Sequence, residues 1–130
     1  LVVIGRVAQC DARWGKQYIY RDCLFEIRET FHGLVRDAVT IRSFGGSVGD
    51  YTLTVSGMPT LKKYRDLFLF LRQNKKSETW HVVGMSQGEF EVWGESLVNT
   101  GNLSNGIGSK VGTLETILTL EDVRTLVALR

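Results

Sequence analysis

Residues 38–57, AVTIRSFGGSVGDYTLTVSG, contain two alternating segments on either side of a glycine-rich stretch. In the first segment Val39 and Ile41 alternate with polar neighbours, and from Tyr51 onward apolar residues alternate with Thr and Ser. A period of two residues is typical of a strand that buries one face and leaves the other in water. The stretch therefore predicts two β-strands joined through a glycine-rich connection.

Strand character of this kind recurs along most of the chain. The run LFLFL at 67–71 is apolar on both faces, which favours a central strand covered on both sides. A short hairpin is expected where the Ser-Gln-Gly turn at 86–88 separates two further strands. In all, we expect strands over residues 1–10, 18–29, 38–44, 51–57, 67–71, 80–85, 89–94 and 113–118.

The segment from residue 18 to 29 changes the parity of its apolar residues partway along. Tyr18 and Tyr20 have the opposite parity to the apolar residues that start at Cys23. A bulge near Arg21 and Asp22 would bring both sets onto one side, and bulges of this kind help to bend strands in small barrels.

The end of the chain has a different period. Thr119 is expected as an N-cap with Asp122 three residues later, and Leu118 can pack against Val123 as a hydrophobic staple. An amphipathic helix over about residues 120–130 follows from the apolar residues at helical spacing, namely Leu120, Val123, Leu126 and Val127. The preceding residues 99–112 are polar and rich in glycine, which predicts a long loop.

Length and composition indicate one globular domain covering residues 1–130. Fourteen glycines and a single proline suggest many tight turns and close backbone approaches. With the strand pattern, this predicts a small, closed or partly open antiparallel β-barrel of the OB type with a C-terminal helix. The net charge of +2 is too small to imply a nucleic-acid or lipid partner, and no apolar run is long enough to span a bilayer.

The two cysteines, Cys10 and Cys23, match neither a redox motif nor a zinc pattern. If residues 12–16 form a hairpin turn, Cys10 lies opposite about residue 19, and Cys23 opposite about residue 6. That register separates the two cysteines too far for a disulfide. We therefore expect two free, half-buried thiols.

Two stretches, GGSVG at 45–49 and GMSQG at 84–88, match the G-x-S-x-G elbow of serine hydrolases. The elbow needs a strand before its serine and a helix after it, whereas both stretches precede strand-like sequence. A triad would require a combination such as Ser47, Asp66 and His81. We interpret both stretches as turns between strands, and a hydrolase using Ser47 or Ser86 as the least favoured function.

Other chemistry has less support. The glycine loop lacks the spacing and the following helix of a phosphate-binding loop, and the histidines and cysteines form no local metal-ligand pair. We expect no cofactor and no metal. Glu89 and Glu91 share one strand face and could perform acid-base chemistry, but an exposed polar face opposite Phe90 and Val92 explains them more simply.

Single-stranded nucleic-acid binding is the main alternative function. Barrels of the OB type bind single strands by stacking bases on aromatic side chains in a basic groove. Core or rim positions remain the favoured interpretation of these aromatic residues, because carboxylates are interleaved with the cations. The candidate stacking residues are Trp14, Tyr18, Tyr20 and Trp93, and the candidate cations are Lys62, Lys63, Arg65, Lys75 and Lys76.

The order of these landmarks resembles a known type of domain. VVIGRV, YIYRDCLFEIRETFHG, VTIRSFGGSVGD, VSGMP, LFLFL and WHVVGMSQGEFEV follow one another as in an uncharacterised bacterial domain that is found in exported proteins, in some cases beside metallopeptidase modules. The same order is similar to the netrin and tissue-inhibitor-of-metalloproteinase type of OB barrel. His32 stands before Gly33 where this type usually has Lys, and the N-terminal Cys pattern of the animal relatives is absent. An inhibitory mechanism through an N-terminal Cys is therefore not carried over.

The resemblance implies a fold and export, to the periplasm or cell envelope, rather than a reaction. The chain starts within an apolar run, which favours a mature or trimmed domain. We expect a noncatalytic binding or accessory module that contacts a protein partner, which could be a peptidase. The candidate contact loop comprises Gly45, Gly46, Ser47, Gly49 and Asp50.

Overall fold

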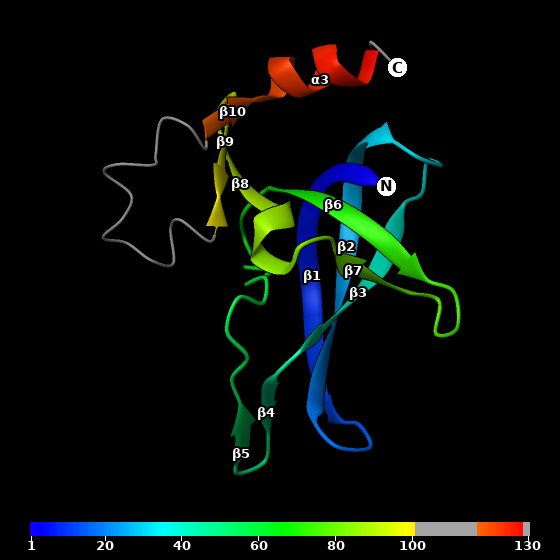
Figure 1. Ribbon diagram of the computed structural model, residues 1–130, viewed down its shortest axis with the longest axis vertical. Helices are drawn as coiled ribbons and strands as arrows, with labels where there is room; N and C mark the ends of the chain where they lie inside the picture. Colours follow the sequence, from blue (N-terminus) through cyan, green and yellow to red (C-terminus); the bar gives the residue numbers. More distant parts are fainter. Residues whose placement is uncertain (101–116, 129–130) are drawn as a thin grey trace.

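The computed structural model describes residues 1–100 and 117–128, and Figure 1 shows how their elements are arranged. The described part is mainly β, which confirms the predicted fold class at that level. The strands are β1 (Val2–Trp14), β2 (Ile19–His32), β3 (Ala38–Phe44), β4 (Gly46–Val48), β5 (Tyr51–Leu53), β6 (Leu67–Asn74), β7 (Thr79–Val82), β8 (Glu89–Trp93), β9 (Ser96–Asn99) and β10 (Ile117–Thr119). The 3₁₀ helix η1 (Met85–Gly88) precedes β8, and helix α3 (Leu120–Ala128) follows β10.

The strand pairings partly close the main sheet into a ring. Its order is β1-β2-β3-β7-β6-β8-β9-β10, and β1 also pairs with β6. The pairings therefore lead from β1 through β2, β3, β7 and β6 back to β1. All of these pairs are antiparallel except β3 with β7, which run parallel and meet at Ile41 and Trp80.

Strand β6 is the centre of the sheet, as its two apolar faces predict. Leu67, Phe68 and Leu69 are all completely buried. Leu67 and Leu69 belong to the larger hydrophobic cluster, whereas Phe68 belongs to a second cluster that includes Leu120 of α3. The strand is apolar on both faces because each face packs into a different core.

The predicted hairpin between β7 and β8 is wrong. The C-terminal half of β6 pairs with β7, and its N-terminal half pairs with β8, both antiparallel. Strands β7 and β8 therefore run in the same direction and cannot form a hairpin. The chain crosses from one to the other through Gly84, which has a φ of 72°, and then through η1.

The pairing of β1 with β2 is irregular at three places, none of which lies at Arg21 and Asp22. The register shifts between Val2 and Val3, between Ile4 and Gly5, and between Val7 and Gln9. Arg21 and Asp22 pair regularly with both β1 and β3. The predicted position of the bulge is therefore wrong. Tyr20 keeps its own parity and does not join the side of the sheet that buries Cys23.

Cys10 and Cys23 are directly paired across β1 and β2 and form a disulfide with an S–S distance of 2.03 Å. The expectation of free thiols is wrong because the hairpin turn lies later than assumed. β1 continues to Trp14, which pairs with Ile19, and Gly15 N donates to Tyr18 O in the turn. In an antiparallel hairpin, moving the turn by one residue along the chain changes the partner of each strand residue by two positions. A turn that lies later than assumed therefore shifts the pairing by several residues.

The start of helix α3 has the predicted capping box. Asp122 N donates to Thr119 Oγ1 at 3.0 Å, and Thr119 N donates to Asp122 Oδ2 at 3.2 Å. The side chains of the expected staple, Leu118 and Val123, lie outside the described residues. The same applies to the expected loop at 99–112 beyond Thr100, and to residues 113–116 of the last predicted strand.

We predict that loss of the disulfide destabilises the fold by about 3 kcal/mol. The bond closes a loop with a sequence separation of 13 residues, and constraint of the unfolded chain by such a loop contributes stability of this size. The measurement is urea unfolding of the oxidised protein and of Cys10→Ser/Cys23→Ser. The double variant should be insensitive to reductant, and labelling of the native wild type by a maleimide without reductant would contradict the assignment.

Candidate functional site

The predicted contact loop at 45–50 contains strand β4 and the turn that joins it to β5 in a short hairpin. Strand β4 pairs with β5, and the hydroxyl oxygens of Ser47 and Thr52 lie 2.8 Å apart in a hydrogen bond. Gly46 has a φ of 126° and lies against Ala12 of β1, so that the hairpin is seated on the first strand pair. The exposed residues Gly49 and Asp50 form its tip.

The serine elbows lack the required geometry. Ser47 belongs to strand β4, and Ser86 lies in the 3₁₀ helix η1, so neither follows a strand and starts an α-helix. The structure also does not bring the possible triad together. Asp66 is engaged by Arg6 and Arg28, and His81 lines an apolar hollow on another part of the surface.

Glu89 and Glu91 face the interior, which overturns the expectation of an exposed polar face. The exposed fractions are 0% for Glu89 and 3% for Glu91, whereas Phe90 and Val92 are only partly buried. The register explains this orientation, because Glu89 lies opposite Leu69 and Glu91 opposite Leu67. Directly opposed residues share a face of the sheet, and this face of β6 is core.

The carboxylate of Glu89 accepts hydrogen bonds from backbone amides of the segment that precedes β6. Leu61 N donates to Glu89 Oε2 at 2.6 Å, and Thr60 N donates to Glu89 Oε1 at 2.8 Å. Thr100 Oγ1 adds a further bond of 2.6 Å to Oε1. A buried carboxylate is tolerated where such donors replace its hydration.

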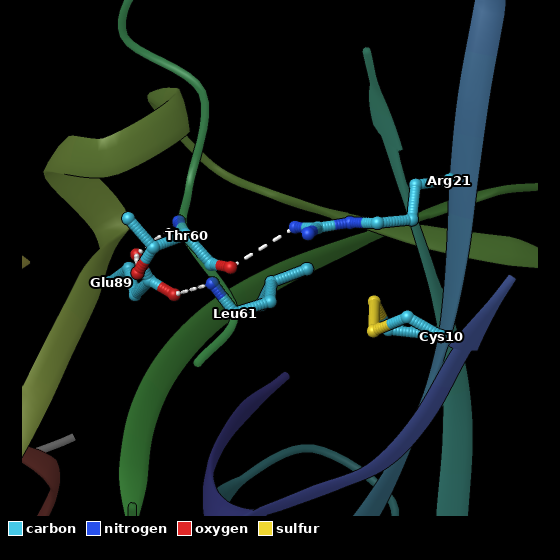
Figure 2. The surroundings of a disulfide bond; sticks show 6 residues. Cys10, Arg21, Thr60, Leu61 and Glu89 are labelled. Atoms are coloured by element: carbon cyan, nitrogen blue, oxygen red, sulfur yellow. Dashed lines mark hydrogen bonds between the residues drawn. A yellow bond between two sulfur atoms is a disulfide. The ribbon is translucent and has the colours of Figure 1, made fainter. Parts of the chain in front are cut away.

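Arg21 holds the same peptide unit from the opposite side. Figure 2 shows its guanidinium directed at the carbonyl of Thr60, to which Nη2 donates at 3.1 Å. The C=O of the unit between Thr60 and Leu61 is thus bound by Arg21, and its N–H by Glu89. Burial lowers the pKa of Arg21, and the nearby carboxylate of Glu89 opposes this effect.

Two further carboxylates hold the rest of this segment, residues 60–66, which we call the clamped loop. Glu91 pairs with Arg65 at 3.1 Å and with Lys62 at 3.6 Å. Asp66 accepts from Arg6 Nε at 2.6 Å and from Arg28 Nη1 at 2.7 Å. Burial acts to raise the pKa of Asp66, but the hydrogen bonds and charges of both arginines outweigh it and hold the pKa below its usual value.

The β1–β2 turn and the β4–β5 hairpin lie at the end of the molecule opposite α3 (Figure 1). These segments and the strand ends beside them carry four exposed aromatic residues. Trp14 and Tyr51 make an edge-to-face contact with centroids 5.6 Å apart, and Tyr18 and Phe44 make another at 5.1 Å. Between 47% and 65% of each of these four residues is exposed. We call them the aromatic end.

A hollow of about 460 Å³ opens beside the aromatic end. Its lining includes Lys16 and Tyr20, with the Arg42 guanidinium 4.2 Å from the Tyr20 ring centre. Hydrogen bonds to Asp22 raise the pKa of Arg42. A second, almost wholly apolar hollow of about 170 Å³ shares Arg42 and Phe44 with the first.

The residues considered for nucleic-acid binding fall into separate groups. Trp14, Tyr18 and Tyr20 lie at or beside the aromatic end, whereas Trp93 lies under Arg65 of the clamped loop, 4.0 Å from the guanidinium carbon. Lys62 and Lys63 belong to the clamped loop, and Lys75 and Lys76 to the turn between β6 and β7. Trp14, Tyr18 and Tyr20 were candidates because of their residue type, whereas Phe44 and Tyr51 were missed because their contacts with Tyr18 and Trp14 depend on strand register.

Within the described residues, no three His, Cys, Asp or Glu side chains are grouped as metal ligands would be. None of the helices in the described ranges is long and apolar enough to cross a membrane. In comparisons with known proteins, no family model, curated protein or solved structure matches this chain.

We predict that Glu89→Gln lowers the free energy of unfolding by about 2–3 kcal/mol, because charged acceptors of buried hydrogen bonds contribute on this scale. Urea unfolding measures the loss, and faster amide exchange at Thr60 and Leu61 should accompany it. Glu29→Gln is a suitable control, since Glu29 pairs with Arg124 at an exposed site and should change stability by less than about 1 kcal/mol. Equal losses in both variants would contradict the role of Glu89.

We predict that Asp66→Asn costs about 1 kcal/mol near neutral pH and much less in acid, because the paired arginines are largely exposed. The pKa of Asp66 is lower in the folded than in the unfolded state. Its stabilisation is therefore present above the unfolded pKa and is lost as pH falls through the folded pKa. Unfolding at pH 7 and at about pH 3 measures this, and a pH-independent difference would contradict it.

Proposed function

We propose that the chain is a noncatalytic binding module of an exported or envelope protein, built on an OB-type barrel, and that it contacts a protein partner through the aromatic end. The observation that carries the proposal is the exposure of Trp14, Tyr18, Phe44 and Tyr51 on adjoining strands and turns. Aromatic side chains are enriched at protein–protein interfaces, so two exposed aromatic pairs at one end of the molecule favour a contact surface there.

The order of strand pairings supports the OB type. A five-stranded Greek-key barrel of this kind is partly open, and β1, β2, β3, β7 and β6 here pair in a continuous circuit. Helix α3 packs outside this circuit through Leu120, which is consistent with the C-terminal helix of the proposed architecture.

The disulfide supports export. Bonds between cysteines persist in secreted and periplasmic proteins and are rare in a reducing cytosol. Cys10 and Cys23 are joined, and the described residues contain no free cysteine.

The arrangement of the aromatic end supports a protein partner. Its aromatic rings are held edge to face, so that little side-chain entropy remains to be lost on binding. The apolar hollow beside Phe44, lined in part by Met58, Pro59 and Met85, extends the surface away from the rings. The tip of the β4–β5 hairpin, which contains Gly49 and Asp50, adjoins Tyr51 and belongs to the proposed contact surface.

Single-stranded nucleic acid is the second candidate ligand, and one observation favours it. The hollow beside the aromatic end is lined by residues of β2, β3 and the β1–β2 turn, a position that OB barrels use for oligonucleotides. Lys16 and Arg42 provide positive charge there. Arg42 is already paired with Asp22, however, which reduces its availability to phosphate.

We predict that Tyr18→Ala/Phe44→Ala abolishes partner capture, because paired aromatic anchors dominate the binding free energy of interfaces. The measurement is a pull-down from the native envelope fraction with quantitative mass spectrometry. A retained protein should decrease at least tenfold with the double variant and remain with Leu34→Ala, which removes an exposed apolar side chain elsewhere.

The same variants separate the two candidate ligands. Salt-sensitive binding of a fluorescein-labelled oligothymidylate that is lost in Tyr18→Ala/Phe44→Ala would replace the protein partner by nucleic acid. Capture that is unchanged in the double variant would exclude the aromatic end as the contact surface.

A further inference from the structure

We infer that the clamped loop and the strands beside it form a second binding surface, which takes an acidic peptide segment of a protein. We call it the basic surface. It is separate from the aromatic end and does not depend on the function proposed for that end. The basic surface consists of the cations Arg6, Arg28, Lys62, Lys63 and Arg65, with the aromatic residues Tyr64 and Trp93.

These residues are contiguous through contacts in the structure. Arg6 and Arg28 meet at Asp66, the last residue of the clamped loop. Arg65 and Lys62 meet at Glu91, and the guanidinium of Arg65 covers the ring of Trp93. The backbone of Lys63 forms an isolated parallel β-bridge with Val7, the residue that follows Arg6.

Charge is layered at the basic surface. The side chains of Asp66 and Glu91 are 19% and 4% exposed, whereas those of Arg6, Arg28 and Lys62 are 62%, 58% and 63% exposed. The anions therefore lie beneath and the cations outside, with Glu26 as an exposed carboxylate at the rim. Solvent meets an excess of positive charge, although the cluster is partly neutralised below the surface.

The cations keep donors for a ligand. A guanidinium has five N–H donors in a fork that matches a carboxylate. Arg6 binds Asp66 through Nε and Arg28 through a single Nη1.

The loop is held in a conformation that its own residues disfavour. Leu61 has a φ of 47° and Tyr64 a φ of 68°, in the left-handed region that side chains with Cβ rarely occupy. Tyr64 is nevertheless 87% exposed, so no packing of its ring explains the strain. Such strain persists only where the surroundings impose it, and it clusters at binding sites. Here Glu89, Glu91 and Asp66 impose it and present Lys63 and Tyr64 outward.

A peptide fits this surface better than a nucleic acid. One face of Trp93 is covered by Arg65, so bases have little open aromatic surface on which to stack. Glu26 is an exposed carboxylate beside Arg6 and Arg28 and would repel a continuous row of phosphates. Carboxylates on a flexible peptide can be spaced to meet individual arginines and lysines.

We expect a fluorescein-labelled octaglutamate peptide to bind the protein at low salt, measured by fluorescence anisotropy. Lys62→Ala/Lys63→Ala should raise the dissociation constant at least tenfold, and Tyr64→Ala by a smaller factor. Lys75→Ala/Lys76→Ala is the matched control, because it removes two lysines from the β6–β7 turn and should raise the constant less than threefold. Unchanged urea midpoints establish that the variants are folded.

Three results would overturn the inference. The first is absence of octaglutamate binding, and the second is an equal loss in both lysine double variants, which would mean bulk charge alone. The third is tighter binding of an oligothymidylate through Lys62 and Lys63, which would assign the surface to nucleic acid. Tyr18→Ala/Phe44→Ala should bind octaglutamate normally, so a failure here is distinguishable from a failure of the function proposed for the aromatic end.

Discussion

One buried carboxylate, that of Glu89, fixes the path of the chain between β5 and β6. Glu89 has no contact with water, so its charge must be balanced by donors from the protein. Its backbone donors are the amides of Thr60 and Leu61, which hydrogen bonds hold against β8, while Arg21 of β2 binds the intervening carbonyl. A segment without regular secondary structure is thereby fixed between strands that are far apart in sequence.

The two surfaces of the molecule, the aromatic end and the basic surface, are held in place by different interactions. The aromatic end is apolar, and its rings are held by one another and by the turns that carry them. The basic surface depends on carboxylates that are hidden beneath their own counter-ions. Both are built around strands of the same ring, because β1 contributes Trp14 at one end and Arg6 nearer the other.

Local alternation was sufficient to predict most strands, including β3 and the central position of β6, because burial of one or both faces leaves a periodic trace. The capping box of α3 was equally readable, since Thr119 and Asp122 are close in sequence. Register was not readable, because a small error in the turn displaced Cys10 from Cys23.

The candidate sites were harder to predict for the same reason. Alternation gave Glu89 a face but could not say which face was core, because its partners Thr60 and Thr100 are distant in the chain. The pairing of β8 with β6 likewise depends on a crossover through η1 that no local signal reveals. The glycine-rich stretch was assigned to a connection, whereas part of it forms β4, because three residues are too few for a period to be recognised.

The parallel seam between β3 and β7 makes the ring mechanically uneven. Across the described strands, this seam has a single paired position, Ile41 with Trp80, whereas β1 and β2 are paired along nearly their whole length. A tensile load that separates β1 from β2 must break a long ladder, but one applied across the seam meets mainly side-chain packing. Opening at the seam would therefore need less free energy than global unfolding. The ring can therefore open between β3 and β7 while β1 and β2, which the disulfide joins, stay paired.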